Sequence, residues 1–200
     1  MKNNTKNAVF LQRLVAYLID GFIITIIISL IASPFINADA IQKINTDLLD
    51  LVNKLQSNDI GYLTYAKEVS VLELQLAKLN GVTTIVTLFV SILYFVVFQI
   101  YNGGQTIGKK IFKIKVVSND GEITMNQMIV RSLLINTILL NMILLMAVSF
   151  INDPMQYMYI FGSFESIQYL FVIVTSLMVM FRKDHISLHD IITNTRVVKK

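Results

Sequence analysis

Four apolar runs divide the chain, and each is long enough to cross a membrane. They cover Leu14 to Ile36, Val82 to Tyr101, Met128 to Ile151 and about Phe164 to Phe181. A helix rises 1.5 Å per residue, so about 20 residues cover the ~30 Å of hydrocarbon in a bilayer. The runs predict a bundle of about four transmembrane helices. The residues just before the last run are also apolar, but Tyr157 and Tyr159 favour a place at the membrane surface.

Residues 37–81, between the first two runs, show a different pattern. Apolar residues recur there at helical spacing on two stretches, which are separated by the turn-forming residues 58–61. We therefore predict an extracytoplasmic insertion of two amphipathic helices. Its surface could serve as a lid or bind a partner, or the two helices could simply pack against each other.

The loop after the second run departs from helical periodicity. Apolar and basic residues alternate over 111–117, and turn-forming residues follow at 118–121. This pattern predicts a β-hairpin, and residues 195–198 have the same character and could add a third strand. The expected fold is an all-α membrane protein with about four spans, an external helical hairpin and a small cytoplasmic β-hairpin.

The distribution of charge predicts the topology. Charged residues make up only 15% of the chain and hydrophobic residues 54%, which excludes an ordinary soluble domain. Of the 17 Lys and Arg residues, only four lie in segment 37–81, and the others lie beside the opposite ends of the spans. By the positive-inside rule, we expect a multi-pass protein of the cell membrane with both termini in the cytoplasm. Its basic residues would contact the lipid bilayer, so the net charge of +4 does not indicate nucleic acid binding.

Polar residues inside the runs carry the functional argument. Placing a carboxylate in hydrocarbon costs free energy, so Asp20 needs either a compensating partner or a functional role. Arg13, seven residues before it, lies on the same helix face about 10 Å away and is the first candidate partner. Gln99, Arg131 and Asn136 are expected in the same cytoplasmic half of the bundle. The cluster could be a structural hydrogen-bond network, or it could form a pocket in which Asp20 binds a proton or a monovalent cation.

The stretch "GGQTIGKK" contains most of a phosphate-binding P-loop. Position 110 is Lys, however, where a P-loop needs the hydroxyl of Ser or Thr to bind magnesium. The stretch also follows a predicted membrane helix and precedes a predicted strand, which is the wrong context. We therefore expect Lys109 and Lys110 to anchor the loop against lipid phosphates instead.

The C-terminal residues contain a second group of polar side chains. His185 and His189 are spaced so that a helix would place them on one face, where they could share a metal ion. The more common use of Asp184 or Ser187 beside them is to cap a helix. Two histidines are insufficient for a closed metal site, and the chain has no Cys. No cofactor, metal site or enzymatic activity is predicted.

Three sequence blocks resemble the RDD family of bacterial multi-pass membrane proteins, named for one Arg and two Asp. "RLVAYLIDGFI" resembles the first family helix and assigns the Arg to Arg13 and the first Asp to Asp20. "SLHDIITNTRVV" resembles the terminal motif and assigns the second Asp to Asp190. The block "GGQTIGKKIFKIKVVSNDGE" carries the family's loop signature, which consists of Gly104, Gln105, Thr106, Gly108 and Lys109. The long insertion at 37–81 departs from many relatives.

The resemblance implies a role in the transport of ions or small solutes. Our hypothesis from the sequence is a cation- or proton-coupled transporter in which Asp20 titrates, while Arg13, Arg131 and Asp190 set its charge and access. Four helices are few for a complete pathway, so a homodimer is expected. The alternative is a non-transporting membrane partner or assembly protein that acts through the external helix pair and the cytoplasmic sheet.

Overall fold

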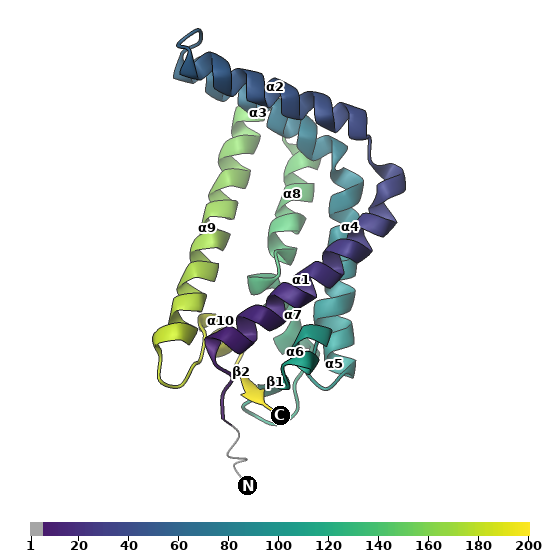
Figure 1. Cartoon of the computed structure of the whole chain (residues 1–200), viewed down its shortest axis with the longest axis vertical. Coiled ribbons are helices and arrows are strands. Elements are labelled where there is room, and N and C mark those ends of the chain that lie inside the picture. The colour runs from purple at the N-terminus through teal and green to yellow at the C-terminus, as the bar shows by residue number, and fades with distance from the viewer. Residues whose placement is uncertain (1–5) are drawn as a thin grey trace.

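Long apolar helices form the body of the protein in the computed structural model, which describes residues 6–200 (Figure 1). In this part of the chain, three continuous helical segments are long and apolar enough to span a membrane. They are α1 (Phe10–Ala32, extended by the 3-10 turn η1, Ser33–Phe35), the run α4–η2–α5 (Gly81–Ile92, Leu93–Phe98 and Gln99–Tyr101) and α9 (Pro154–Phe181). The prediction of a mostly helical protein with several spans is confirmed.

A fourth candidate span is broken near its middle. Helices α7 (Met125–Ile135) and α8 (Ile138–Phe150) are bent by 69° at the residues between them. Thr137 has a φ of 55°, a left-handed conformation that a β-branched residue seldom adopts and that interrupts the helix. The break leaves carbonyl groups without helical partners, and Gln168 Nε2 of α9 donates to the carbonyl of Leu134 at 2.8 Å. The apolar run over 128–151 is therefore two half-helices.

Helix α9 begins well before the predicted start at residue 164. The side chain of Asp153 accepts a hydrogen bond from the Gln156 N–H at 2.7 Å, and Pro154 occupies the first helical position. Both are strong helix-start signals. The segment that contains Tyr157 and Tyr159 therefore belongs to the first turns of α9. Tyr157 is 4% exposed, so its side chain packs inside the protein, with Leu74 and Ala147, and does not face the lipid.

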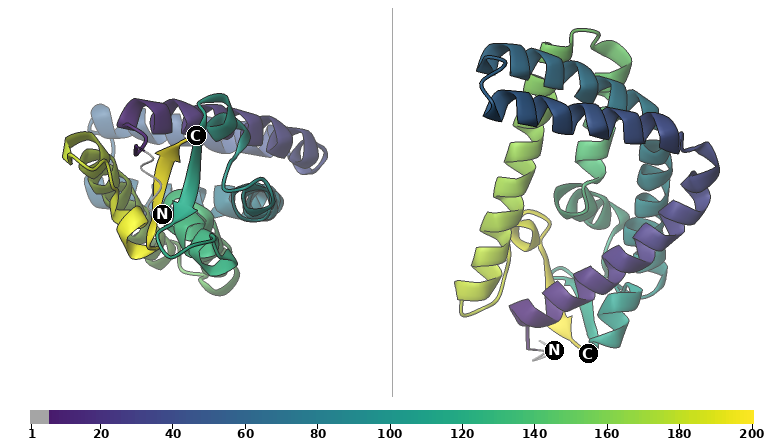
Figure 2. Two further views of the ribbon diagram at one scale, coloured as in Figure 1. Left: turned by 90° about the horizontal axis from the view of Figure 1, so that it is seen from below. Right: turned by 45° about the horizontal axis from the view of Figure 1, so that its top comes forward.

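Segment 37–81 folds as two helices that lie across one end of the bundle (Figures 1 and 2). They are α2 (Ala38–Gln56), capped by Asn37, and α3 (Tyr62–Leu79). Leu74 of α3 packs with Ala147 of α8 and Tyr157 of α9, so α3 forms part of the core. We call this the hairpin end of the molecule. Lys6, the first residue that the structure describes, lies beside Lys199 at the opposite end, which we call the terminal end.

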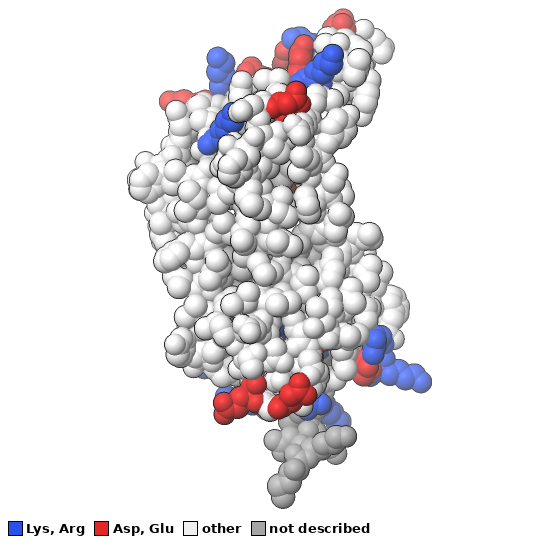
Figure 3. All heavy atoms as spheres, turned by 180° about the vertical axis from the view of Figure 1, so that it is seen from behind, with Lys and Arg blue, Asp and Glu red and all other residues white. Residues whose placement is uncertain are grey.

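Charged side chains gather at these two ends. Between them, the face drawn in Figure 3 has a wide band that is almost free of Lys, Arg, Asp and Glu. Large apolar side chains such as Phe22, Phe89 and Leu170 are exposed on the spans. Such an apolar surface is stable in contact with lipid tails, whereas its exposure to water would be unfavourable. The protein is a multi-pass membrane protein.

A small antiparallel sheet closes the terminal end. Strand β1 (Ile114–Ser118) pairs with β2 (Thr195–Lys199), and Val116 lies opposite Val197. Two short helices precede these strands, α6 (Ile107–Ile111) and α10 (Leu188–Ile192). The predicted antiparallel sheet is confirmed, but it is not a hairpin of the second loop. Residues after the turn lead to Thr124, which caps α7, and the tail supplies the second strand.

Candidate functional site

Asp20 is completely buried in α1, and three donors hold its carboxylate. The hydroxyl of Tyr94 donates to Oδ1 at 2.6 Å, and the hydroxyl of Thr106 donates to Oδ2 at 2.5 Å. The backbone N–H of Gly108 donates to Oδ1 at 2.7 Å. The predicted ion pair between Asp20 and Arg13 is wrong. The carboxylate is stabilised instead by neutral donors from segments that lie far away in the sequence.

The loop signature supplies two of these donors. Thr106 is the N-cap of α6, and its side chain accepts from the backbone N–H of Lys109. A Cβ atom on Gly108 would lie 2.1 Å from the carbonyl oxygen of Ala16, so only glycine allows α6 to approach α1 this closely. The expectation that the stretch leads directly into a strand was wrong, because α6 intervenes. Like a P-loop, it presents a helix start to an anion, but the anion is the carboxylate of Asp20.

The other signature residues join the second span to the sheet. Gly104 has a φ of +83°, and a Cβ atom there would lie 2.2 Å from the carbonyl oxygen of Val116. The carbonyl of Gly104 accepts from the Val116 N–H at 2.9 Å and from Gln99 Nε2 at 3.1 Å. Gln105 Nε2 donates to the carbonyl of Ile114 at 2.8 Å. These contacts fix the position of β1 under the second span.

Asp190 lies in a separate cluster, between two arginines. Arg13 Nη1 is 2.6 Å from Asp190 Oδ2, and Arg131 Nη1 donates to Asp190 Oδ1. Burial opposes ionisation of Asp190, but Arg131 and Arg13 hold the pKa of its carboxyl well below the usual range. Arg13 also donates to the carbonyl of His185, and Arg131 donates to the hydroxyl of Thr195. This cluster ties α1 and α7 to the C-terminal segment.

The three family residues therefore do not share one site. Arg13 and Asp190 form an ion pair, whereas Asp20 belongs to the network around α6. Our expectation of a single site was wrong because it placed residues only by their depth in the membrane. Lys109 lies between the two networks, where it experiences the charges of Asp20, Asp190 and both arginines.

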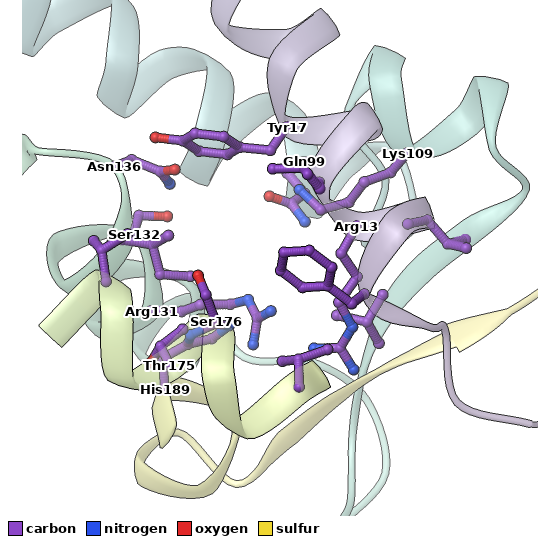
Figure 4. Close-up of a pocket in the computed structure, with 17 residues that line it drawn as sticks. Arg13, Tyr17, Gln99, Lys109, Arg131, Ser132, Asn136, Thr175, Ser176 and His189 are labelled. Atoms are coloured by element: carbon purple, nitrogen blue, oxygen red, sulfur yellow. The ribbon is translucent and has the colours of Figure 1, made fainter. Parts of the chain in front are cut away.

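A cavity of about 220 Å³ lies beside both networks (Figure 4). Arg13, Lys109 and Arg131 contribute positive charge to its lining, while neither Asp20 nor Asp190 is part of it. Lys109 and Arg131 extend into the cavity from different walls. The whole lining consists of Phe10, Arg13, Leu14, Tyr17, Gln99, Lys109, Ile114, Arg131, Ser132, Ile135, Asn136, Val172, Thr175, Ser176, Val179, His189 and Val197.

The predicted polar cluster of Gln99, Arg131 and Asn136 is therefore brought together in one lining. Several other polar residues of the lining were missed. Tyr17 lies one helical turn after Arg13 and could have been assigned to the same face. Thr175 and Ser176 form a polar pair inside an otherwise apolar run.

Several polar groups in the cavity have unused hydrogen-bonding capacity. The hydroxyl of Thr175 and Nδ1 of His189 are buried and have no partner among residues 6–200. Within the same residues, Arg131 makes hydrogen bonds through Nη1, and its other two guanidinium nitrogens make none. Unsatisfied buried polar groups are rare and call for an explanation, which a ligand or water in the cavity would provide.

Burial lowers the pKa of two side chains of the lining, Lys109 and His189, with different results for their charge. Burial lowers the pKa of Lys109 to about 8, Asp20 opposes this shift, and Arg131 and Arg13 reinforce it. Lys109 therefore still carries its proton near pH 7. Burial and then Arg131 lower the pKa of His189 well below its usual value, so this ring is neutral. The lining thus has three cations, one more than the two carboxylates behind it.

The histidine pair does not form the metal site considered above. Ser187 and Asp190 form a capping box that starts α10, so His185 lies before the helix and not on its face. His185 Nδ1 lies 2.9 Å from the carbonyl oxygen of Val179. Within the described residues, no three His, Cys, Asp or Glu side chains are grouped to hold a metal ion. The capping alternative is confirmed for Ser187.

Comparison with known proteins agrees with the motif assignments. No curated protein and no solved structure matches the chain. The family model described as the RDD family matches residues 7–194, nearly the whole chain. The matched range includes the Asp20 network and the ion pairs of Asp190 with Arg13 and Arg131. The protein therefore belongs to the RDD family.

Proposed function

We propose that this protein binds a molecule with an anionic group in its cavity and carries that molecule across the membrane. The charge of the lining supports this proposal. Arg13, Lys109 and Arg131 border the cavity, and the two neighbouring carboxylates lie outside it. Uncompensated charge in a region of low dielectric constant is costly. A bound anion would remove that cost, whereas a bound cation would increase it.

The donors needed for such a ligand are present. Lys109 Nζ has only one long contact in the described residues, 3.4 Å from Thr106 Oγ1, so it can donate to a ligand. Arg131 can offer the edge of its guanidinium group that Asp190 does not use. Charge-assisted hydrogen bonds from Arg and Lys are the strong contacts by which proteins hold carboxylate and phosphate groups. Thr175 could add a neutral donor.

The broken span supports transport in addition to binding. In many transporters, the substrate site lies where a membrane helix is interrupted. Here Asn136, at the break between α7 and α8, lines the cavity. A change in the angle between the two half-helices would change the wall of the site.

A cation or proton site at Asp20 has less support. Both oxygens of Asp20 already accept hydrogen bonds, and the side chain is fully buried. A cation would have to displace Tyr94, Thr106 or Gly108.

The alternative of a non-transporting partner protein would be favoured by a stoichiometric heterologous crosslink in native membranes, together with no flux from the purified protein. We propose that the transporting form is a homodimer, since four spans enclose only a small cavity.

The test is uptake by proteoliposomes that contain the purified protein. One set is given radiolabelled inorganic phosphate or dicarboxylates, and a parallel set is given radiolabelled sodium or rubidium. We expect uptake of an anion that falls at least about tenfold in Lys109→Gln, since a charged hydrogen bond contributes about 1.5–3 kcal/mol. The neighbouring exposed lysine provides the control, because Lys110→Gln should transport normally. Cation uptake that is lost in Asp20→Asn, with no anion uptake, would support the cation- or proton-coupled mechanism instead.

A further inference from the structure

The mouth of the cavity lies between two membrane-spanning helices. Among the 17 lining residues, the large apolar side chains with the greatest exposure are Leu14 and Tyr17 of α1 and Val172 of α9, at 37%, 41% and 36%. These residues belong to the spans and not to the loops. The cavity therefore opens sideways, toward the position of the lipid.

Other parts of the cavity lining are tightly packed. At the terminal end, Ile114 and Val197 of the sheet are 0% and 2% exposed and form the floor together with the buried His189. The buried side chains of Gln99, Arg131 and Ser132 form further walls. A molecule in the membrane would reach these groups through the mouth between α1 and α9.

The helices on either side of the mouth diverge. Helix α1 crosses the bundle obliquely, while α9 stands along it, so the two separate toward the hairpin end (Figures 1 and 2). α1 packs mainly on α6 and α4 and only slightly on α9. At the mouth, the lining residues Leu14 and Val172 of these two spans are apolar, which suits contact with an alkyl chain.

We infer that the ligand of the cavity is an amphiphile, an anionic phospholipid whose phosphate lies among Lys109, Arg131 and Arg13 and whose acyl chains leave between α1 and α9. This inference rests on the proposed function and names the class of its ligand. Arg13 lies in the first turn of α1 and Lys109 in the short helix α6, while Arg131 lies past the middle of α7. All three lie toward the terminal end of the spans, where a lipid headgroup would meet the hydrocarbon. Basic pockets between spans are the usual sites for anionic headgroups.

The absence of Trp from the sequence allows a direct test. Leu14→Trp places a single fluorophore at the mouth, and Phe89→Trp places one on the exposed face of α4, away from the cavity. Each variant is reconstituted in phosphatidylcholine that contains a small fraction of either brominated phosphatidylglycerol or brominated phosphatidylcholine. Bromine on the acyl chains quenches fluorescence on contact, so quenching reports which lipid occupies the site.

We expect brominated phosphatidylglycerol to be enriched at least about fivefold over phosphatidylcholine beside the Leu14→Trp reporter, the factor that one Lys or Arg near the headgroup contributes. Adding Lys109→Gln should remove most of this preference, and adding Lys110→Gln should not. The Phe89→Trp reporter should be quenched equally by both lipids. Equal quenching by the two lipids at the Leu14→Trp reporter would overturn the lipid assignment.

A second measurement separates the lipid from a free anion. Inorganic phosphate is added to vesicles without phosphatidylglycerol, and the reaction of Lys109 with an amine-specific reagent is followed by mass spectrometry. Protection of Lys109 by phosphate, without any lipid preference at the Leu14→Trp reporter, would overturn the inference and leave the proposed function standing. Protection only in vesicles that contain phosphatidylglycerol supports the inference. No protection in either case would overturn both.

Discussion

Arg13 and Asp190, separated by 177 positions in the chain, form a buried ion pair with 2.6 Å between Nη1 and Oδ2. Arg131 contacts the other oxygen of the same carboxylate. One carboxylate thus compensates two guanidinium groups in the interior. Asp190 is therefore the residue whose loss leaves the most charge unpaired.

Replacing this carboxylate should destabilise the fold strongly. We expect Asp190→Asn to lower the free energy of unfolding by about 3–5 kcal/mol, because two buried arginines lose their counter-charge. The measurement is the thermal and denaturant-induced unfolding of the detergent-solubilised protein. The control is Asp184→Asn, which removes an exposed ion pair with Arg182 in the same segment. That change should cost at most about 1 kcal/mol, and equal losses in the two variants would contradict the role given to Asp190.

The close contact between α6 and α1 depends on glycine at 108. In Gly108→Ala, the new methyl group would meet the carbonyl oxygen of Ala16 at 2.1 Å and Asp20 Oδ1 at 2.9 Å. We expect α6 to move away from α1, with a loss of about 1–3 kcal/mol of stability. Gly162→Ala in α9 is the control, because a Cβ atom there has no neighbour within 4 Å. Alanine is the better helix former, so the control should be neutral or stabilising, and the same unfolding assay compares the two.

Tyr94 holds Asp20 and α6 together. Its hydroxyl donates to Asp20 at 2.6 Å and accepts from the Ile107 N–H at 3.1 Å. Removing the hydroxyl in Tyr94→Phe should cost about 1.5–3 kcal/mol, the range for hydrogen bonds to charged groups. Tyr169→Phe removes an exposed hydroxyl that bonds Glu165 at 3.2 Å, and it should change stability by less than about 0.5 kcal/mol. An unchanged unfolding midpoint in Tyr94→Phe would show that the Asp20 network contributes little.

Ligand binding should weaken at alkaline pH because of Lys109. Burial lowers its pKa to about 8, with Arg13 and Arg131 reinforcing and Asp20 and Asp190 opposing this shift. Below that pH the ammonium group is charged and attracts an anion, and above it the attraction is lost. A bound anion raises the pKa again, so the loss should be centred somewhat above pH 8. The measurement is anion-dependent thermal stabilisation between pH 6 and about 10.

Two variants check the origin of this pH dependence. Lys109→Arg keeps its charge over the whole range, so its anion-dependent stabilisation should persist at the alkaline end. Lys109→Gln should bind weakly at every pH and show no such decline. A decline of the same size in all three proteins would assign the titration to another group.

The parts of this fold that depend on local pattern were predictable from the sequence. The apolar runs located the spans, and the alternation over 111–117 located β1. The break at Thr137 was not predictable, because a β-branched residue gives no sign that it will adopt a positive φ. The early start of α9 was predictable in principle, since Asp153 and Pro154 form a typical helix start that the search for apolar runs did not consider.

The partners of the buried charges were not predictable. Arg13 was assigned to Asp20 because both lie on one helix face, but the pairing depends on which segment approaches each residue in three dimensions. Asp20 receives its donors from Tyr94 and α6, and Arg13 receives its carboxylate from the tail. The motif assignment identified the correct residues. Only the packing of α6 and α10 against the spans decides how these residues divide between two networks.

The order of synthesis gives the buried ion pairs a further consequence. The ribosome makes Asp190 177 residues after Arg13 and 59 residues after Arg131, so both arginines reach the membrane before their shared carboxylate exists. The newly inserted spans must therefore tolerate two uncompensated charges until the C-terminal segment arrives. Docking of that segment neutralises the arginines and closes the floor of the cavity in a single step. A chain cut short before Asp190 would thus be exposed to membrane quality control as an unfinished protein.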